Sequence, residues 1–526
     1  MRQRDFHTGR SAVYAESGAA ATAHPAATLA AIDVLRAGGN AVDAAITAHA
    51  LLAVIEPQST GIGGDGFVIL SKDGAAPIGL NGSGRAPAAA TLEWYREQGI
   101  AEIVSTTPHA VTVPGAVDAW CRLAEDHGTR SIEELLQPAI TAAADGYLVT
   151  PRVAYDWQNA AAKLAGDPDA AAIYLPGGRA PAAGDRHRQE ALAGTLRTIG
   201  RKGRDGFYRG PVAEDIVAKL RSLGGLHTED DFAGNTPSYV EPIRSSYRGH
   251  DVYEIPPNGQ GVTVQVILNV LQDYDFGRLG LADRFHLMAE AAKAAYARRN
   301  ALIGDPDFVD VPTDRLRSLE EAERIRRHIR MDRAAPWPEV EGLVHSDTTY
   351  LCVVDRDRTS VSFINSLFAG FGSGITAPQS GVVLQNRGAS FRLIDGHPNA
   401  IAPGKRPMHT IIPGLLAKGG RTVMPFGVMG GHYQPVGHAQ LLTGMLDLDL
   451  DPQEALEAPR AFANADQLEV EPTVPLAVAE DLAGRGHRVV PADGPHGGGQ
   501  AIWIDHERGV LIAGSEPRKD GCALGY

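Results

Sequence analysis

The sequence predicts a mixed fold of the α/β (α+β) class, in which helical and strand patterns dominate different parts of the chain. Up to residue 347 the chain is rich in alanine and carries apolar residues at helical spacing. From residue 348 onward, short β-rich runs alternate with glycine turns. With 526 residues, 44% of them hydrophobic, the chain can bury a large core, and its length alone permits two or more domains.

The first part shows clear helix boundaries. Apolar residues recur at helical spacing within residues 25–36, and Gly38-Gly39 ends that helix. Asn40 can cap the next helix, which runs from Ala41 to about Val54. Further helices are expected after the turn at 112–117, over 135–145, over 264–271 and from Ser318 onward.

The second part begins with a predicted hairpin. Residues 350–354 and 360–365 are β-rich, and the polar turn 355–358 joins them. A short apolar run over 423–428 leads to Gly430 and Gly431, and a last hairpin is expected over 501–513. Backbone N–H groups of a Gly-Gly pair at a strand end can bind an oxyanion, although such a pair is also an ordinary turn.

Two adjacent hydroxyl residues, Thr348 and Thr349, lie where a Pro-containing segment enters the first of these strands. If the chain is cut before Thr348, the hydroxyl lies beside its own new α-amine, whose pKa of about 7.7–8.0 suits a base at neutral pH. This placement suits an N-terminal nucleophile, with Thr349 in that role if the register differs by one residue. The alternative is that the pair simply begins a strand, as β-branched residues often do.

Two glycine-rich loops precede these elements. Gly61–Phe67 follows a helix and enters a strand, the reverse of the strand–loop–helix order of a dinucleotide site, so its glycines are expected to permit close backbone approach near a cleft. The second loop, 81–87, carries Arg85, which is either a surface charge or a bidentate clamp for a carboxylate.

Charge and composition exclude several partners. The net charge of −14 argues against nucleic acid and anionic membranes. The three cysteines are far apart and show no metal-ligand spacing, so neither disulfides nor a metal is expected. The first residues lead into no apolar signal segment, and the longest apolar run, 44–55, is too short to span a bilayer. A cytoplasmic protein is the expectation.

The order of several short motifs resembles the γ-glutamyltransferase (glutathione hydrolase) family of N-terminal-nucleophile hydrolases. The matching segments span nearly the whole chain: Val34–Ala45, Gly61–Phe67, Val113–Gly115, Asp347–Thr349, Phe371–Ile375, Pro403–Pro407, Gly430-Gly431, Arg518–Gly521 and Gly525-Tyr526. The resemblance implies a four-layer αββα sandwich made by autocleavage into a large fragment, 1–347, and a small fragment, 348–526. These fragments would form one intertwined heterodimer, and a dimer of such heterodimers is also allowed.

The resemblance also assigns catalytic roles. Cleavage would fall between Asp347 and Thr348, the nucleophile. The supporting hydroxyl falls on Ser366, and the oxyanion-hole glycines fall on Gly430 and Gly431. No cofactor is implied. An acyl-enzyme would form on Thr348 and pass to water or to an amine.

The acyl pocket departs from the family pattern. The family's arginine aligns with Ser83, two positions before Arg85, and its acidic partner of the substrate α-amine aligns with Ser390. The remaining departures are Phe368 in place of an asparagine, and His409 and Thr410 in place of two serines; Arg387 is close in sequence. A pocket without that carboxylate has no evident partner for an ammonium. An acyl group with a carboxylate but no amine would fit Arg85 or Arg387 better.

Three functions are therefore compared. The first is a threonine amidohydrolase or acyltransferase that cleaves a γ-glutamyl or similar carboxylate-bearing amide of small size, with a non-glutamyl amidohydrolase of the oxamate or glutaryl-acylase type as its variant. The second is a catalytically idle relative that binds a metabolite, which ligand-induced thermal stabilisation without cleavage would reveal. The third is a nucleotide-binding enzyme built on the glycine loop, which its reversed context disfavours.

Overall fold

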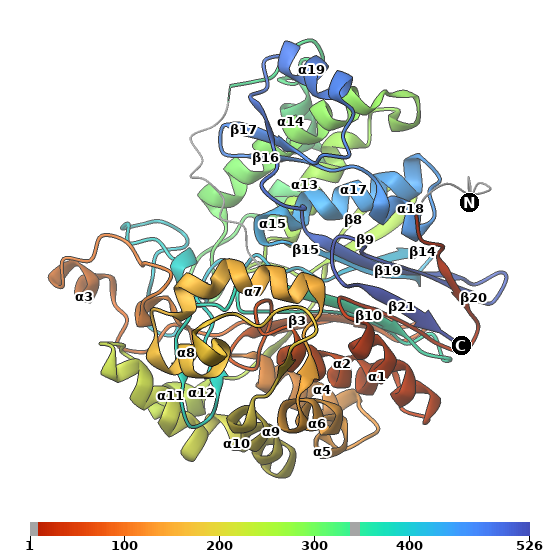
Figure 1. Cartoon of the computed structure of the whole chain (residues 1–526). Helices are drawn as coiled ribbons and strands as arrows, with labels where there is room; N and C mark the ends of the chain where they lie inside the picture. Colours follow the sequence, from red (N-terminus) through yellow and green to blue (C-terminus); the bar gives the residue numbers. More distant parts are fainter. Residues whose placement is uncertain (1–8, 337–347) are drawn as a thin grey trace.

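Two seven-stranded sheets form the centre of the molecule. The computed structural model describes residues 9–336 and 348–526 (Figure 1). The sheet that carries Thr348, called here the Thr348 sheet, has the order β21-β2-β10-β11-β3-β4-β7. Its strands are Cys522–Gly525 (β21), Ala19–Thr22 (β2), Thr349–Val354 (β10), Ser360–Ser366 (β11), Asp65–Ser71 (β3), Ile78–Gly82 (β4) and Ser238–Val240 (β7).

The second sheet, called the Gly430 sheet, has the order β1-β20-β19-β15-β14-β9-β8. Its strands are Val13–Ala15 (β1), Val510–Ser515 (β20), Gly498–Asp505 (β19), Arg421–Met429 (β15), Gly414–Lys418 (β14), His250–Glu254 (β9) and Ile243–Tyr247 (β8). Strands β10 and β11 contact β15, so the two sheets pack face to face.

Helices cover the outer face of each sheet (Figure 1). The Thr348 sheet contacts α1 (Pro25–Arg36), α2 (Ala41–Ile55) and α4 (Ala116–His127). The Gly430 sheet contacts α13 (Gly261–Leu271), α17 (Gln434–Asp447) and α18 (Pro452–Glu457). The chain therefore folds as a four-layer αββα sandwich, as the resemblance implies.

The remaining helices lie outside or beside these layers. They are Leu92–Glu97 (α3), Ile132–Leu135 (α5), Gln137–Asp145 (α6), Pro151–Leu164 (α7), Pro168–Tyr174 (α8), Glu190–Lys202 (α9), Asp205–Tyr208 (α10), Pro211–Ser222 (α11), Glu229–Gly234 (α12), Leu281–Leu302 (α14), Thr313–Leu316 (α15), Leu319–Arg326 (α16) and Leu476–Gly484 (α19). Within the described ranges, no helix is both long and apolar enough to cross a membrane.

Strands from both parts of the chain are neighbours in the sheets. Strands β10 and β11 lie between β2 and β3, which come from the first part. The division at residue 348 is therefore not a boundary between two separately folded domains. The predicted hairpin is confirmed as β10 and β11, paired antiparallel with Thr349 opposite Asn365.

Helix α2, from the first part of the chain, packs against strands β10 and β11 of the Thr348 sheet. Every residue of Ala41–Ile55 is buried. Asn40 caps the helix, and Asp43 completes a capping box, so the predicted cap and the helix start are confirmed.

Candidate active site

Thr348 lies immediately before β10, almost fully buried at 1% exposure. Its Oγ1 is 3.1 Å from the Ser366 Oγ, at the end of the neighbouring strand β11. The Phe368 N–H donates to Ser366 Oγ at 2.8 Å, which orients the Ser366 hydroxyl toward Thr348. The Thr349 hydroxyl instead donates to the Asn365 carbonyl at 3.4 Å. Asp347 lies outside the described residues.

The glycine loop Gly61–Phe67 packs closely against the backbone at Ser366 and Val383. A Cβ on Gly64 would lie 2.2 Å from the Ser366 carbonyl oxygen, and one on Gly63 would lie 2.1 Å from that of Val383. The expectation that these glycines permit close backbone approach is confirmed.

Gly430 and Gly431 turn the chain at the end of β15. Their φ values are +114° and +57°, which glycine adopts without strain. The Gly430 carbonyl accepts from the Tyr433 N–H at 3.0 Å, and the Gly431 carbonyl accepts from Gln260 Nε2 at 3.0 Å. These bonds fix the conformation of the turn, whose backbone N–H groups are the predicted oxyanion donors.

The Gly-Gly turn and the hydroxyl pair belong to one connected set of contacts. The rings of Phe368 and His432 meet edge to face with centroids 6.3 Å apart. Gln260 Nε2 joins the Gly431 carbonyl to that of Thr410, to which it donates at 2.7 Å. A cavity of about 220 Å³ opens onto Gly430 and is also lined by Arg152, Tyr155, Asn159, Gly370 and Lys519.

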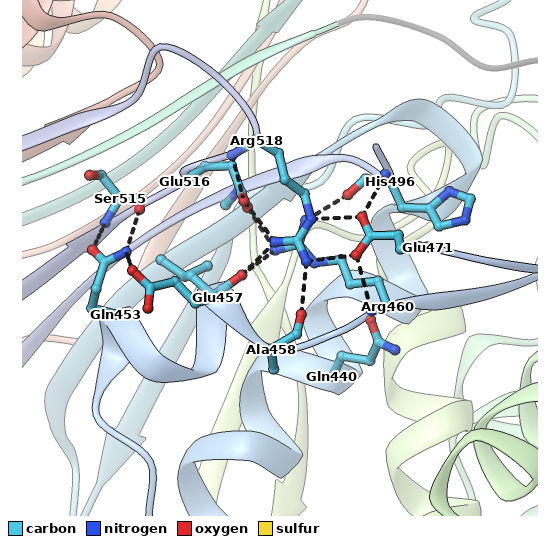
Figure 2. A network of polar contacts seen from close by, with 12 residues as sticks. Gln440, Gln453, Glu457, Ala458, Arg460, Glu471, His496, Ser515, Glu516 and Arg518 are labelled. Carbon is cyan, nitrogen blue, oxygen red and sulfur yellow. Dashed lines mark hydrogen bonds and ion pairs between the residues drawn. The ribbon is translucent and has the colours of Figure 1, made fainter. Parts of the chain in front are cut away.

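A buried network of ion pairs joins Arg518 and Arg460 to Glu471 and Glu516 (Figure 2). Arg518 Nε is 2.7 Å from Glu471, and Arg518 Nη1 is 2.9 Å from Glu516. Arg460 Nη2 is 2.6 Å from the other oxygen of Glu516. Each buried charge thus faces an opposite charge, which offsets the cost of removing it from water.

This network holds the segment that packs on Gly430. Arg460 donates to the His496 carbonyl at 2.6 Å, and Glu516 accepts from the Gly499 N–H at 2.8 Å. A Cβ on Gly430 would lie 2.7 Å from the Gly497 Cα, so the two segments are in direct contact. The turn's position therefore depends on the network.

Arg387 is a buried cation that contacts Thr410 and Phe368. It is fully buried, its Nη1 donates to Thr410 Oγ1 at 2.7 Å, and its guanidinium carbon lies 4.0 Å from the Phe368 ring centroid. Among the described residues its Nε and Nη2 have no acceptor. Burial lowers the pKa of Arg387 to about 9, against a smaller opposing effect of the Asp65 charge.

His409 is held by Asp65, a residue that sequence reasoning missed. His409 Nε2 lies 2.9 Å from Asp65 Oδ2, while the Ile411 N–H donates to Nδ1 at 3.4 Å, so Nε2 carries the proton. Burial, and then the Arg387 charge, lower the pKa of His409 to about 4, and the ring is neutral at pH 7. Asp65 Oδ1 accepts from the Gly84 and Gly115 N–H groups and from Gln385.

The other predicted site residues lie differently. Arg85 is partly exposed, donates to the Gly404 carbonyl at 2.9 Å and pairs with Asp307 at 3.2 Å. Ser390 ends the same short turn as Arg387, and its buried Oγ has no partner within the described chain. The structure thus brings together Thr348, Ser366, Phe368, Arg387, Thr410 and Gly431, with Arg85 engaged elsewhere.

Comparison with known proteins gives a consistent picture. The sequence profile of the family described as "Gamma-glutamyltranspeptidase" matches residues 27–526. A "Glutathione hydrolase-like YwrD proenzyme" of Bacillus subtilis is 36% identical, covering 94% of this chain and 95% of its own. An "Oxamate amidohydrolase proenzyme" of Klebsiella pneumoniae is 35% identical over 97% and 98% of the two chains. The crystal structure of a cephalosporin acylase from Bacillus halodurans superposes with a TM-score of 0.94 at 40% identity, covering 100% of this chain and 99% of that one.

Proposed function

Since the chain belongs to the Gamma-glutamyltranspeptidase family, we propose that it is an amidohydrolase with an N-terminal threonine nucleophile that it generates by its own cleavage. The observation that carries the proposal is the Thr348–Ser366 hydroxyl pair, 3.1 Å apart, which contacts through Phe368 and His432 connect to the Gly-Gly turn. The relatives named as proenzymes support the processing step.

Processing requires one acyl shift and one hydrolysis. Thr348 Oγ1 attacks the Asp347 carbonyl, the peptide C–N bond breaks, and an ester joins the two fragments through Thr348. Water then hydrolyses the ester, which leaves a carboxylate on Asp347 and a free amine and hydroxyl on Thr348. The fragments 1–347 and 348–526 stay together as a heterodimer because β10 and β11 lie between β2 and β3.

The mature site then acylates itself with a substrate. The Thr348 amine accepts the proton of its own hydroxyl, and Oγ1 attacks the amide carbonyl of the substrate. The Gly430-Gly431 turn supplies N–H groups to the oxyanion, and the leaving amine takes the proton. Water, or an acceptor amine, releases the acyl group and restores the hydroxyl.

Arg387 defines the acyl group. Its two unpartnered donors are buried, and a carboxylate can accept from both. Ser390 stands where the family pattern has an acid, so a substrate ammonium would lack its partner. We infer an acyl group that carries a carboxylate but no α-amine, of the oxamate or glutaryl type, in preference to γ-glutamyl.

The processing proposal is tested by electrophoresis and N-terminal sequencing. Wild-type protein should run as two bands, with the smaller one beginning at Thr348, and Thr348→Ala should stay one band. Thr348→Ser keeps a hydroxyl that can attack the Asp347 carbonyl and should still be cut. A wild-type chain that stays whole would instead favour the idle metabolite-binding alternative.

The acyl group is tested with matched anilides. Glutaryl-anilide should be a better substrate than γ-glutamyl-anilide, and butyryl-anilide, without a carboxylate, should be poor. Arg387→Met should lower kcat/KM for glutaryl-anilide about a hundredfold or more, since a buried charge pair is lost, and should leave butyryl-anilide nearly unchanged. If γ-glutamyl-anilide is much the best substrate, the inferred acyl group is wrong.

A further inference from the structure

A second cavity lies in the helical layer over the Gly430 sheet. It has a volume of about 430 Å³ and lies between α14, α17, α18 and the short 3-10 helix Phe276–Arg278. Most of its wall is apolar, with Phe276, Phe285, Met288, Leu441, Leu448 and Leu456 among the lining residues. A cavity of this size is within the range of small-molecule sites, roughly 300–1,000 Å³.

One face of α14 supplies both apolar and charged lining. Leu281, Arg284, Phe285 and Met288 all line the cavity and follow the i, i+3, i+4, i+7 spacing of one helix face. Arg284 is half-buried in this apolar surround. The helix therefore places Arg284 among three apolar residues of the same helix face.

Within the described residues, the Arg284 guanidinium has no partner. Throughout residues 9–336 and 348–526, no acceptor or acidic group binds it, and its Nε is buried without a partner. Burial lowers the pKa of Arg284, and no nearby carboxylate opposes that effect. By contrast, Arg298 on the same helix pairs with Glu321 at 2.6 Å. The buried Nε is a donor without an acceptor among the described residues, and an anion in the cavity could accept from it.

We propose that this cavity is a ligand site for a small hydrophobic monocarboxylate, whose carboxylate binds Arg284 and whose apolar body contacts Phe285, Met288 and Leu441. A carboxylate can accept from the unpaired donors. An amine would be repelled by the guanidinium, and a neutral ligand would leave it unpaired.

This site is separate from the acyl pocket but touches the network behind the Gly-Gly turn. Arg460, Gln440 and Ala458 line the cavity and appear beside the ion-pair network in Figure 2. Arg460 also binds Glu516 and the His496 carbonyl. An occupant therefore contacts a residue that holds the segment next to Gly430, while the proposal itself does not depend on the proposed function.

Calorimetry and thermal unfolding of the full protein with 4-phenylbutyrate test this site, with the neutral 4-phenylbutanamide as the matched probe. The acid should bind and raise Tm, and the amide should bind at least tenfold more weakly. Arg284→Gln should weaken binding of the acid at least tenfold while leaving basal activity unchanged. Leu441→Trp, which fills the cavity, should abolish binding.

A second arginine variant separates this site from the acyl pocket, which also favours carboxylates. Binding of 4-phenylbutyrate should persist in Arg387→Met. If binding of the acid is as tight in Arg284→Gln as in wild type, the proposal is wrong. If binding disappears in Arg387→Met, the acid binds in the acyl pocket and the proposal is also wrong. Equal binding of acid and amide, or no binding of either, would also overturn it.

Discussion

Arg518 and Arg387 are both buried arginines close to the proposed site, yet the protein treats their charges in opposite ways. Arg518 faces Glu471 and Glu516 and donates to two backbone carbonyls. Burial alone would lower the pKa of Arg518, but the Glu516 and Glu471 charges outweigh it and raise the pKa above its usual value. Arg387 has one hydroxyl partner, and burial lowers its pKa to about 9.

This difference in pairing distinguishes a structural charge from a charge that is available to bind a ligand. A compensated ion-pair network can hold backbone segments in place, as it does for the segment beside Gly430. An uncompensated guanidinium contributes no such stability, and it persists in a fold only where another requirement maintains it. For Arg387, we propose that this requirement is the binding of a substrate carboxylate.

Removal of an acid from the paired region should give the largest effect. Glu516→Ala leaves Arg460 facing no acid and removes one of the partners of Arg518, and it should lower the free energy of unfolding by about 3–5 kcal/mol. Urea unfolding of wild type and variant measures this difference. A loss below about 1 kcal/mol would mean that the network is not a structural element.

Removal of the unpaired charge should have the opposite sign. Arg387→Met keeps an apolar stem against Phe368 and eliminates two buried donors without acceptors. The free energy of unfolding should stay the same or rise by about 1 kcal/mol, because relief of desolvation outweighs one lost hydrogen bond. Urea unfolding of Arg387→Met measures this change. If Arg387→Met lowers the free energy of unfolding as much as Glu516→Ala does, Arg387 is a structural charge like those of the ion-pair network.

The pH dependence of kcat/KM should also reveal the lowered pKa of Arg387. Because the free-enzyme pKa of Arg387 is lowered to about 9, kcat/KM for a carboxylate-bearing anilide should fall as the pH rises through 9. Butyryl-anilide should show no such fall, and the Arg387→Met profile should lack it. Between pH 9 and the usual value of 12.5, the unfolded chain holds a proton that the folded one has lost, so this group adds stability as pH rises.

The sequence predicted correctly those elements that depend on residues close together in the chain. The α2 cap and the β10–β11 hairpin follow from side chains within a few residues of each other, and both agree with the structure within one or two residues. Strand β2 consists of three alanines and a threonine, which favour a strand only weakly, and it forms because β10 and β21 pair with it. Helix α17 is buried on most of its surface, so it shows no clear helical periodicity.

In the site, too, local motifs indicated some residues, whereas others became evident only from contacts between distant segments. Resemblance of short motifs indicated Thr348, Ser366 and the Gly-Gly turn. In the structure the two hydroxyls are 3.1 Å apart, and contacts through Phe368 and His432 connect them to the turn. Asp65 was missed because its partners come from loops far apart in sequence, although an acid among four glycines was a signal. The choice between Arg85 and Arg387 also needed the structure, since exposure and pairing distinguish them.

The smallest effect is expected at Arg85. Its guanidinium pairs with the exposed Asp307 at 3.2 Å, and such exposed pairs contribute about 0–1 kcal/mol. Arg85→Gln should therefore change kcat/KM for glutaryl-anilide less than about twofold and the free energy of unfolding by less than about 1 kcal/mol. Steady-state kinetics beside Arg387→Met provides the comparison. A loss at Arg85 as large as that at Arg387 would show that the partly exposed arginine binds the acyl carboxylate, and it would assign the specificity role to Arg85 in place of the buried Arg387.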